Sequence, residues 1–185
     1  TPPPDLKETQ RAIDATLKSQ SFPVTGSPVA LAVDIERERK TTWNVVAWLP
    51  PTGAPDHPAA YDSASAPEYL AIGAHYDHLG MGGENSLSPD TLAIHNGADD
   101  NASGTSALIE VARALVHDPT PRPRGVLFAA FSGEELGLLG SAWLVGHCPL
   151  PITRNVAMLN MDMVGRMKDD KLQIGGVGTS PRFRP

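Results

Sequence analysis

Three short apolar runs, each separated from the next by a stretch of helical periodicity, constrain the fold of this 185-residue chain most strongly. The runs cover residues 69–74, 125–131 and 156–160, and their length is typical of buried strands. Residues 102–116 and 136–145 lie between the runs and carry apolar side chains at helical spacing. Apolar strands that alternate with helices predict a sheet covered by helices on both faces. We therefore expect an α/β sandwich with a mostly parallel central sheet.

The rest of the chain predicts one more helix, two more strands and two long loops. The helix is expected after Asp5, which is a plausible N-cap, and it extends to about residue 19. The strands are expected at residues 29–35 and 44–49, and the loops at 50–67 and 81–95. The proline-rich residues 1–4 are interpreted as a linker or a cut end. One domain over residues 1–185 is the expected organisation.

Composition excludes several classes of function. The formal net charge is −6, whereas a nucleic-acid-binding protein normally carries a basic face. Cys148 is the one cysteine, so an internal disulfide and a cysteine-based zinc site are excluded, and we expect this side chain to be half-buried. No stretch of the sequence approaches the length of a membrane-spanning helix.

Acidic residues and histidines gather where the expected strands end and the helices begin. They are His75, Asp77, His78, Asp99, Asp100, Glu134, Glu135 and Asp162. In open α/β sheets the carboxyl ends of the strands form the ligand site, so these side chains can converge there. So many carboxylates at one place would repel one another unless divalent cations lay between them. Each short pattern alone is more typical of a surface pair or a helix cap. Their joint occurrence favours a hydrolytic metal centre, with zinc the best match to ligands of this type.

Four segments resemble the metal motifs of the co-catalytic zinc aminopeptidases. This family includes bacterial leucyl aminopeptidases, and its relatives include glutamate carboxypeptidase II and glutaminyl cyclases. The segments are GAHYDHLG at 73–80, NGADDNASG at 96–104, FSGEELGLLGS at 131–141 and NMDMVGR at 160–166. The resemblance implies a three-layer α/β sandwich with a mixed central sheet. It also implies that the enzyme hydrolyses N-terminal peptide bonds through a two-zinc centre.

The resemblance assigns metal ligands position by position. His75 and Asp162 resemble the ligands of the first metal, and Glu135 resembles a ligand of the second. Asp99 resembles the carboxylate that bridges both metals, and the peptide bond between Asp99 and Asp100 is expected to be cis.

Two further residues resemble catalytic groups. Glu134 resembles the general base, which takes a proton from water and returns one to the leaving amine. Asp77 resembles the carboxylate that hydrogen-bonds the first histidine ligand and fixes its tautomer.

The family carries one more histidine ligand beyond the last motif, and this sequence has no histidine after Asp162. We therefore expect a C-terminally truncated domain that binds one zinc ion well and the second weakly, with little or no activity alone. His78 lies on the same loop as His75 and either reaches the cleft or, as we favour, lies in water. His95 is expected to pack or hydrogen-bond locally.

The resemblance also implies partners and a location. The expected substrate is a peptide with a free N-terminus. An upstream protease-associated domain and a secreted or periplasmic location are expected by analogy with related aminopeptidases. Two other functions stay open: a non-catalytic binding or receptor-type domain on the same fold, and another hydrolase or a cyclase that uses the same metal core.

Overall fold

The structure is a computed structural model that describes residues 5–21, 30, 32–36, 39–83, 86–88 and 90–183. The chain divides into two compact units, Thr1–Arg39 and Lys40–Pro185. All four strands and every expected site residue belong to the second unit, and the extent of a catalytic domain stays a prediction. None of the helices in the described residues is both long and apolar enough to span a membrane.

The second unit is built on a four-stranded mixed sheet with the strand order β1-β3-β2-β4. Strands β2 (Tyr69–His75), β3 (Gly125–Phe131) and β4 (Asn155–Asn160) are parallel, and β1 (Val45–Leu49) is antiparallel to β3. These bounds confirm the four strands expected in this part of the chain. The strand expected at 29–35 is wrong where the structure describes it, since residue 30 and residues 32–35 are not in a strand. Val29 and Leu31 lie outside the described residues.

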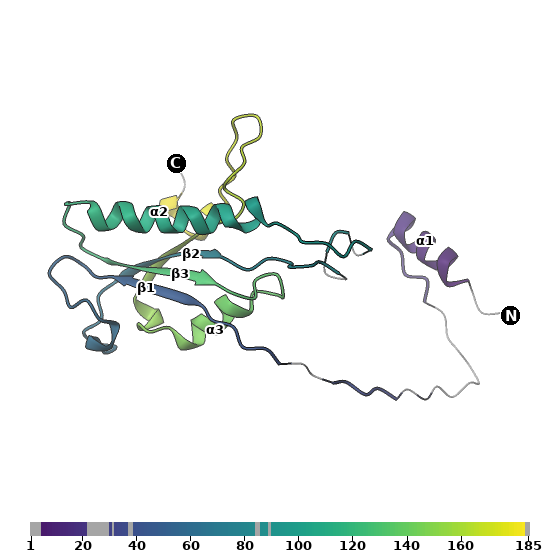
Figure 1. Cartoon of the computed structure of the whole chain (residues 1–185), viewed down its shortest axis with the longest axis horizontal. Coiled ribbons are helices and arrows are strands. Elements are labelled where there is room, and N and C mark those ends of the chain that lie inside the picture. Colours follow the sequence, from purple (N-terminus) through teal and green to yellow (C-terminus); the bar gives the residue numbers. More distant parts are fainter. Residues whose placement is uncertain are drawn as a thin grey trace. The chain divides into compact units, whose positions relative to one another are not determined.

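Helices cover the two faces of the sheet, which gives the three layers of an α/β sandwich (Figure 1). Helix α2 (Gly104–His117) lies on one face, and α3 (Leu139–His147) lies on the other. Both helices begin two or three residues later than the sequence predicts. Residues 98–103 form a wider turn before α2, and the left-handed backbone of Leu138 immediately precedes α3.

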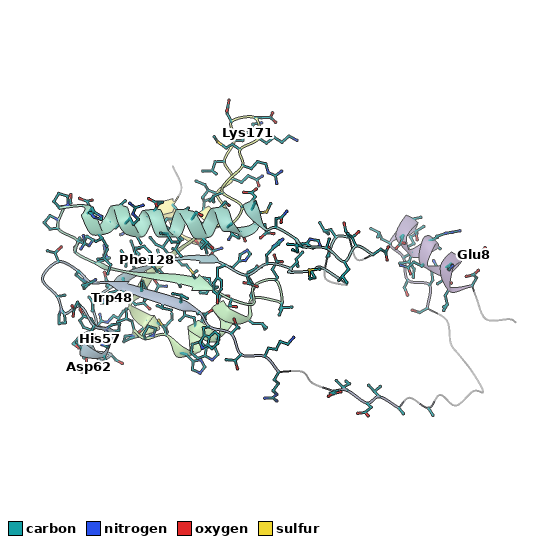
Figure 2. All side chains as sticks on the ribbon, viewed as in Figure 1. Glu8, Trp48, His57, Asp62, Phe128 and Lys171 are labelled. Atoms are coloured by element: carbon teal, nitrogen blue, oxygen red, sulfur yellow. The ribbon has the colours of Figure 1, made fainter. Side chains whose placement is uncertain are left out.

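The core has two parts, because successive side chains of β3 point to opposite faces of the sheet. Phe128 packs with Leu108 of α2 on one face, and the expected inner face of that helix is confirmed. Leu127 packs with Tyr69 and Leu150 on the other face, and Trp48 of β1 covers this second cluster. Figure 2 shows Trp48 and Phe128 on neighbouring strands inside this layered body.

Helix α1 (Leu6–Thr16) belongs to the first unit and confirms the expected N-terminal helix. The Asp5 carboxylate accepts a hydrogen bond of 2.8 Å from the backbone N–H of Lys7, so Asp5 is the N-cap as predicted. The remaining helical elements are single short turns at Pro58–Ala60, Ile152–Arg154, Val177–Thr179 and Pro181–Phe183.

Candidate metal centre

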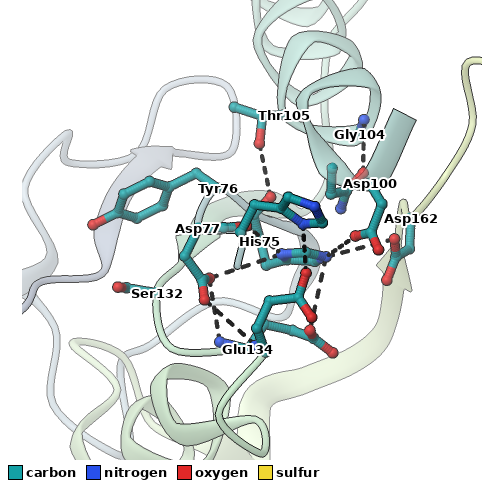
Figure 3. Close-up of polar contacts among 12 residues, drawn as sticks. His75, Tyr76, Asp77, Asp100, Gly104, Thr105, Ser132, Glu134 and Asp162 are labelled. Carbon is teal, nitrogen blue, oxygen red and sulfur yellow. Dashed lines mark hydrogen bonds and ion pairs between the residues drawn. The ribbon is translucent and has the colours of Figure 1, made fainter. Parts of the chain in front are cut away.

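Parallel pairing brings the carboxyl ends of β2, β3 and β4 to one edge of the sheet. His75 ends β2 and lies opposite Phe131, the last residue of β3. The ladder to β4 continues past the strand, since the N–H of Met161 donates to the carbonyl of Gly73 at 2.9 Å. Asp162 therefore reaches the level of His75, and Figure 3 shows the two side chains facing each other. The convergence that the sequence predicts is thus present.

His75 is the most buried member of the centre, with 2% of its surface exposed. Its Nδ1 lies 3.0 Å from the backbone carbonyl of Asp77 and must be the donor, because a carbonyl only accepts. In the neutral ring the lone pair is then on Nε2, which lies 3.1 Å from Asp100 Oδ1 and 3.6 Å from Asp162 Oδ1. Nε2 is buried and makes no hydrogen bond with the described residues. A lone pair that faces two carboxylates is unfavourable unless a cation lies among them.

Three overlapping groups of side chains have the composition and spacing of cation ligands among the described residues. They are His75, Asp100 and Asp162; His75, Glu134 and Glu135; and His78, Asp100 and Glu135, with the ligand atoms of each group within 4.8 Å of one another. The imidazole and carboxylate donors, without cysteine, fit zinc in a hydrolytic site. The buried Nε2 of His75 and this donor set together satisfy the requirements of such a cation.

Asp100, rather than Asp99, carries the carboxylate that two of these groups share. Asp99 belongs to none of the three groups of described residues. The expected cis bond is also displaced by one residue, because the cis peptide joins Asp100 to Asn101. Asp99 is not a member of these groups because its carboxylate already has other partners. It accepts hydrogen bonds from the N–H of Gly165 at 2.9 Å and from Arg166 Nε at 3.3 Å.

The neighbours of Asp100 tie its turn to the segment after β4. Asn101 is 2% exposed and donates from Nδ2 to the carbonyl of Met161 at 3.0 Å. Its Oδ1 accepts from the backbone N–H of Gly104 at 2.9 Å and of Met163 at 3.3 Å. These contacts hold the loop that carries Asp162 against the turn that carries Asp100.

Asp77 supports the centre in a way that differs from the prediction. Its carboxylate is 3.8 Å from His75 Nδ1, and the hydrogen bond to that nitrogen is made by the Asp77 backbone carbonyl instead. The carboxylate accepts from the backbone N–H groups of Glu134 at 3.2 Å and Glu135 at 3.4 Å. Asp77 therefore positions one histidine through its main chain and the Glu134–Glu135 pair through its side chain.

The electrostatics of the centre favour positive charge. Burial lowers the pKa of His75, but the hydrogen bond to Asp77 and the carboxylates of Asp162, Glu134 and Asp100 outweigh it, so that the pKa lies above its ordinary value. Burial raises the pKa of Glu134; His75 opposes this, and nearby carboxylates, Glu135 foremost, add to it. Glu134 Oε2 lies 3.9 Å from His75 Nε2, beside a cavity of about 190 Å³ that both residues line.

His78 contradicts the interpretation that we favoured, a loop histidine in water. It is 21% exposed, and its Nδ1 lies 2.6 Å from Glu135 Oε1. His95 confirms the local role expected of it, because its Nε2 contacts Ser86 Oγ at 3.3 Å. The two rings are 6.3 Å apart, and His95 joins none of the three groups.

Reasoning from the sequence missed Asp100 as the shared carboxylate, as well as the contributions of Asn101 and Thr105. The Thr105 hydroxyl at the start of α2 donates to the His75 carbonyl at 2.8 Å and fixes the end of β2 against that helix (Figure 3). The sequence held a partial signal for Asp100. Of two adjacent acids only one can face the strand ends, so Asp100 was a candidate, but the pattern does not show which of the two it is.

Comparison with known proteins finds similarity to peptidases. The profile of peptidase family M28 matches residues 58–184, a span that includes His75 and the other members of the centre. A "Probable zinc metalloprotease" of Pyrenophora tritici-repentis is 31% identical in an alignment of 173 positions that covers 83% of this chain and 38% of that protein.

Two further relatives have names that state an aminopeptidase activity. Aminopeptidase YwaD of Bacillus subtilis is 39% identical over 100 residues, or 54% of this chain and 19% of the relative. Leucine aminopeptidase 1 of Trichophyton rubrum is 35% identical over 107 residues, or 56% of this chain and 27% of the relative. The chain thus matches less than half the length of each of these relatives.

Proposed function

This chain belongs to peptidase family M28, and from that premise we propose that it is the metal-binding part of a zinc-dependent aminopeptidase. The observation that carries the proposal is the buried Nε2 of His75, which faces the carboxylates of Asp100 and Asp162 with Glu134 beside it. The names of two relatives, an aminopeptidase and a leucine aminopeptidase, support the choice of N-terminal peptide bonds as the substrate.

We propose two cation sites, and Asp100 would contribute to both. His75 and Asp162 would also hold the first cation, and Glu135 would supply a donor to the second. When bound, the cations supply Lewis acidity toward a peptide carbonyl and lower the pKa of water.

The chain's own residues supply the proton transfers. Glu134 accepts the proton of the attacking water and returns it to the nitrogen of the leaving amine. Its raised pKa brings it closer to neutrality, where a group can both take and give a proton. The Asp77 carboxylate holds the main chain at Glu134 and Glu135, so that one side chain serves the water while the next reaches a cation.

The 190 Å³ cavity is proposed to receive part of the peptide. Apolar side chains of Phe131, Leu138 and Met158 line it together with Glu134. It therefore offers an apolar residue a place next to the reacting bond.

Binding to the zinc-loaded chain tests the proposal without requiring turnover. L-Leucine hydroxamate should bind in calorimetry, its N-acetyl derivative should bind at least about tenfold more weakly, and the His75→Gln chain should bind neither compound. Hydrolysis of L-leucine p-nitroanilide, where measurable, should disappear in Glu134→Gln while zinc stays bound, because a general base contributes about 10²–10⁴-fold. Equal binding of the acetylated compound, or zinc content unchanged by His75→Gln, would refute the proposal.

The same proposal includes a location outside the cytoplasm. Its support is the analogy with related aminopeptidases, from which a secreted or periplasmic location is expected. Cell fractionation of the native source, with detection of the chain by antibody, tests it, and recovery in the cytoplasmic fraction contradicts it.

A further inference from the structure

We propose that His78 is a direct ligand of the second cation and completes a site with Glu135 and the shared Asp100. The inference rests on the proposed metal centre and assigns a ligand that the four-motif resemblance does not supply. Ligand atoms of these three residues lie within 4.8 Å of one another.

The contact between His78 and Glu135 is the first argument. The distance of 2.6 Å between Nδ1 and Oε1 is that of a short hydrogen bond, so the two groups already face each other. Two donors on one tetrahedral zinc ion are about 3.3 Å apart, given bonds of about 2.0–2.1 Å. Moving the two atoms apart by less than about 1 Å would therefore turn the hydrogen-bonded pair into a ligand pair. The cation would replace this hydrogen bond.

The packing of the His78 ring is the second argument. Gly97 has a φ of 60° at the start of the turn that carries Asp100. A Cβ atom at Gly97 would lie 2.8 Å from His78 Cγ and 2.7 Å from the backbone oxygen of Asp100. The absence of a side chain at Gly97 therefore allows the imidazole to lie against the turn that presents the shared carboxylate.

Charge is the third argument. Four carboxylates take part in the three groups, and they belong to Asp100, Glu134, Glu135 and Asp162. One divalent cation offsets half of their charge, and a second offsets the remainder. The first cation position uses His75, whose buried Nε2 makes no hydrogen bond and faces the shared carboxylate. A neutral imidazole at the second position adds a donor without adding negative charge.

Cadmium-113, a spin-active substitute for zinc, tests ligation directly. The chain is loaded with two equivalents, and through-bond coupling between cadmium and histidine ring protons is recorded. We expect two cadmium resonances, one coupled to the ring of His75 and the other to the ring of His78. His95, with its ring 6.3 Å from that of His78, is the internal control and should show no coupling.

A variant separates ligation from mere orientation of Glu135. In His78→Asn the amide N–H can still donate to the Glu135 carboxylate, but the neutral amide oxygen is a far weaker zinc ligand than an imidazole nitrogen. The dissociation constant of the second zinc ion should rise by more than about 100-fold, above the range of about 10–100-fold for loss of an outer hydrogen-bond partner. The first zinc ion and the His95→Asn control should change by less than about threefold.

The results that overturn the inference differ from those that overturn the proposed function. If the second cadmium resonance shows no coupling to the ring protons of His78, or if His78→Asn keeps near-normal zinc affinity, His78 is rejected as a ligand. The His75 site is not affected by either result. Failure of the chain to bind either metal, with no coupling to His75, rejects the metal centre and this inference together.

Discussion

Replacement of Asp99 and Asp100 by asparagine, one at a time, distinguishes the two adjacent acids. The sequence motif points to Asp99 as the shared ligand, whereas the structure places Asp100 in both groups and engages Asp99 with Gly165 and Arg166. Asparagine preserves the shape of the side chain and removes its charge, so the two variants differ only in which contact is lost.

For Asp99→Asn the expected loss is one of stability. The amide oxygen still accepts from Gly165, but a bond to a charged group becomes a neutral one, which costs about 1 kcal/mol. Arg166 is 75% exposed, so its ion pair adds about 0–1 kcal/mol. The metal-free chain should therefore unfold more easily by about 1–2 kcal/mol, with zinc affinity within about tenfold of the original.

For Asp100→Asn the expected loss is one of zinc binding. Free zinc at 100 times the dissociation constant stabilises a folded protein by about 2.7 kcal/mol, or roughly 5–11 °C for a chain of this size. If loss of the shared donor weakens binding by about 100-fold, the same zinc concentration gives only about 0.4 kcal/mol, or roughly 1–2 °C. The metal-free variant should be no less stable than the original, because one of the crowded negative charges is gone.

Calorimetric scans with a chelator and at fixed free zinc measure both effects. The zinc-induced rise in melting temperature should survive in Asp99→Asn and nearly vanish in Asp100→Asn. The opposite pattern would show that the first acid is the shared ligand and would refute the reasoning from the structure.

Three further predictions follow from the surroundings of the centre. Asn101→Ala leaves two backbone N–H groups and a carbonyl without partners, so the free energy of unfolding in urea should fall by about 3 kcal/mol. A fall of less than about 1 kcal/mol would contradict the role given to these three hydrogen bonds. Gly97→Ala combines a φ of +60° with a steric clash, so it should lower the free energy of unfolding by more than the roughly 1–2 kcal/mol of backbone strain alone. Gly53→Ala, with a φ of +80° and open space around the new Cβ, is the control that measures the strain. The pKa values of His75 and Glu134 are raised in the folded metal-free chain. The folded chain therefore binds more protons than the unfolded chain in two pH windows, which start at the ordinary pKa values of 6.5 for His75 and 4.5 for Glu134 and end at the raised ones. Its free energy of unfolding should therefore fall as pH rises through these windows, and Glu134→Gln should remove the lower part of that slope; an unchanged slope would disprove this assignment.

Most of the sheet could be predicted because buried strands leave a plain signal. The runs at 69–74 and 125–131 are apolar on both faces, and the structure places β2 and β3 at the middle of the sheet. The stretch at 29–35 has the alternation of a strand, but its described residues pair with none. Alternation is a local property, whereas a strand needs a partner edge, and the sequence does not show which edges are available.

The centre was predictable as a set of residues and not as a set of contacts. Parallel topology brings His75 and Asp162 together once the strands are known. The choice between Asp99 and Asp100 depends on the backbone geometry of the turn at residues 98–103, which residue types do not encode in an obvious way. The approach of His78 to Glu135 joins two loops that are 57 residues apart, and only the folded chain reveals it.

The hydrogen bonds that Asp99 and Asn101 make to the segment after β4 have a consequence for protein engineering. Together they fasten that segment to the turn at residues 98–103 at both its beginning and its end. The segment contributes only backbone groups to these three bonds, so a chimera that imports residues 160–166 from a relative but keeps the original turn should retain them. The side chains of Asp99 and Asn101 are therefore the part of this contact that must be kept, whereas the segment after β4 can be exchanged.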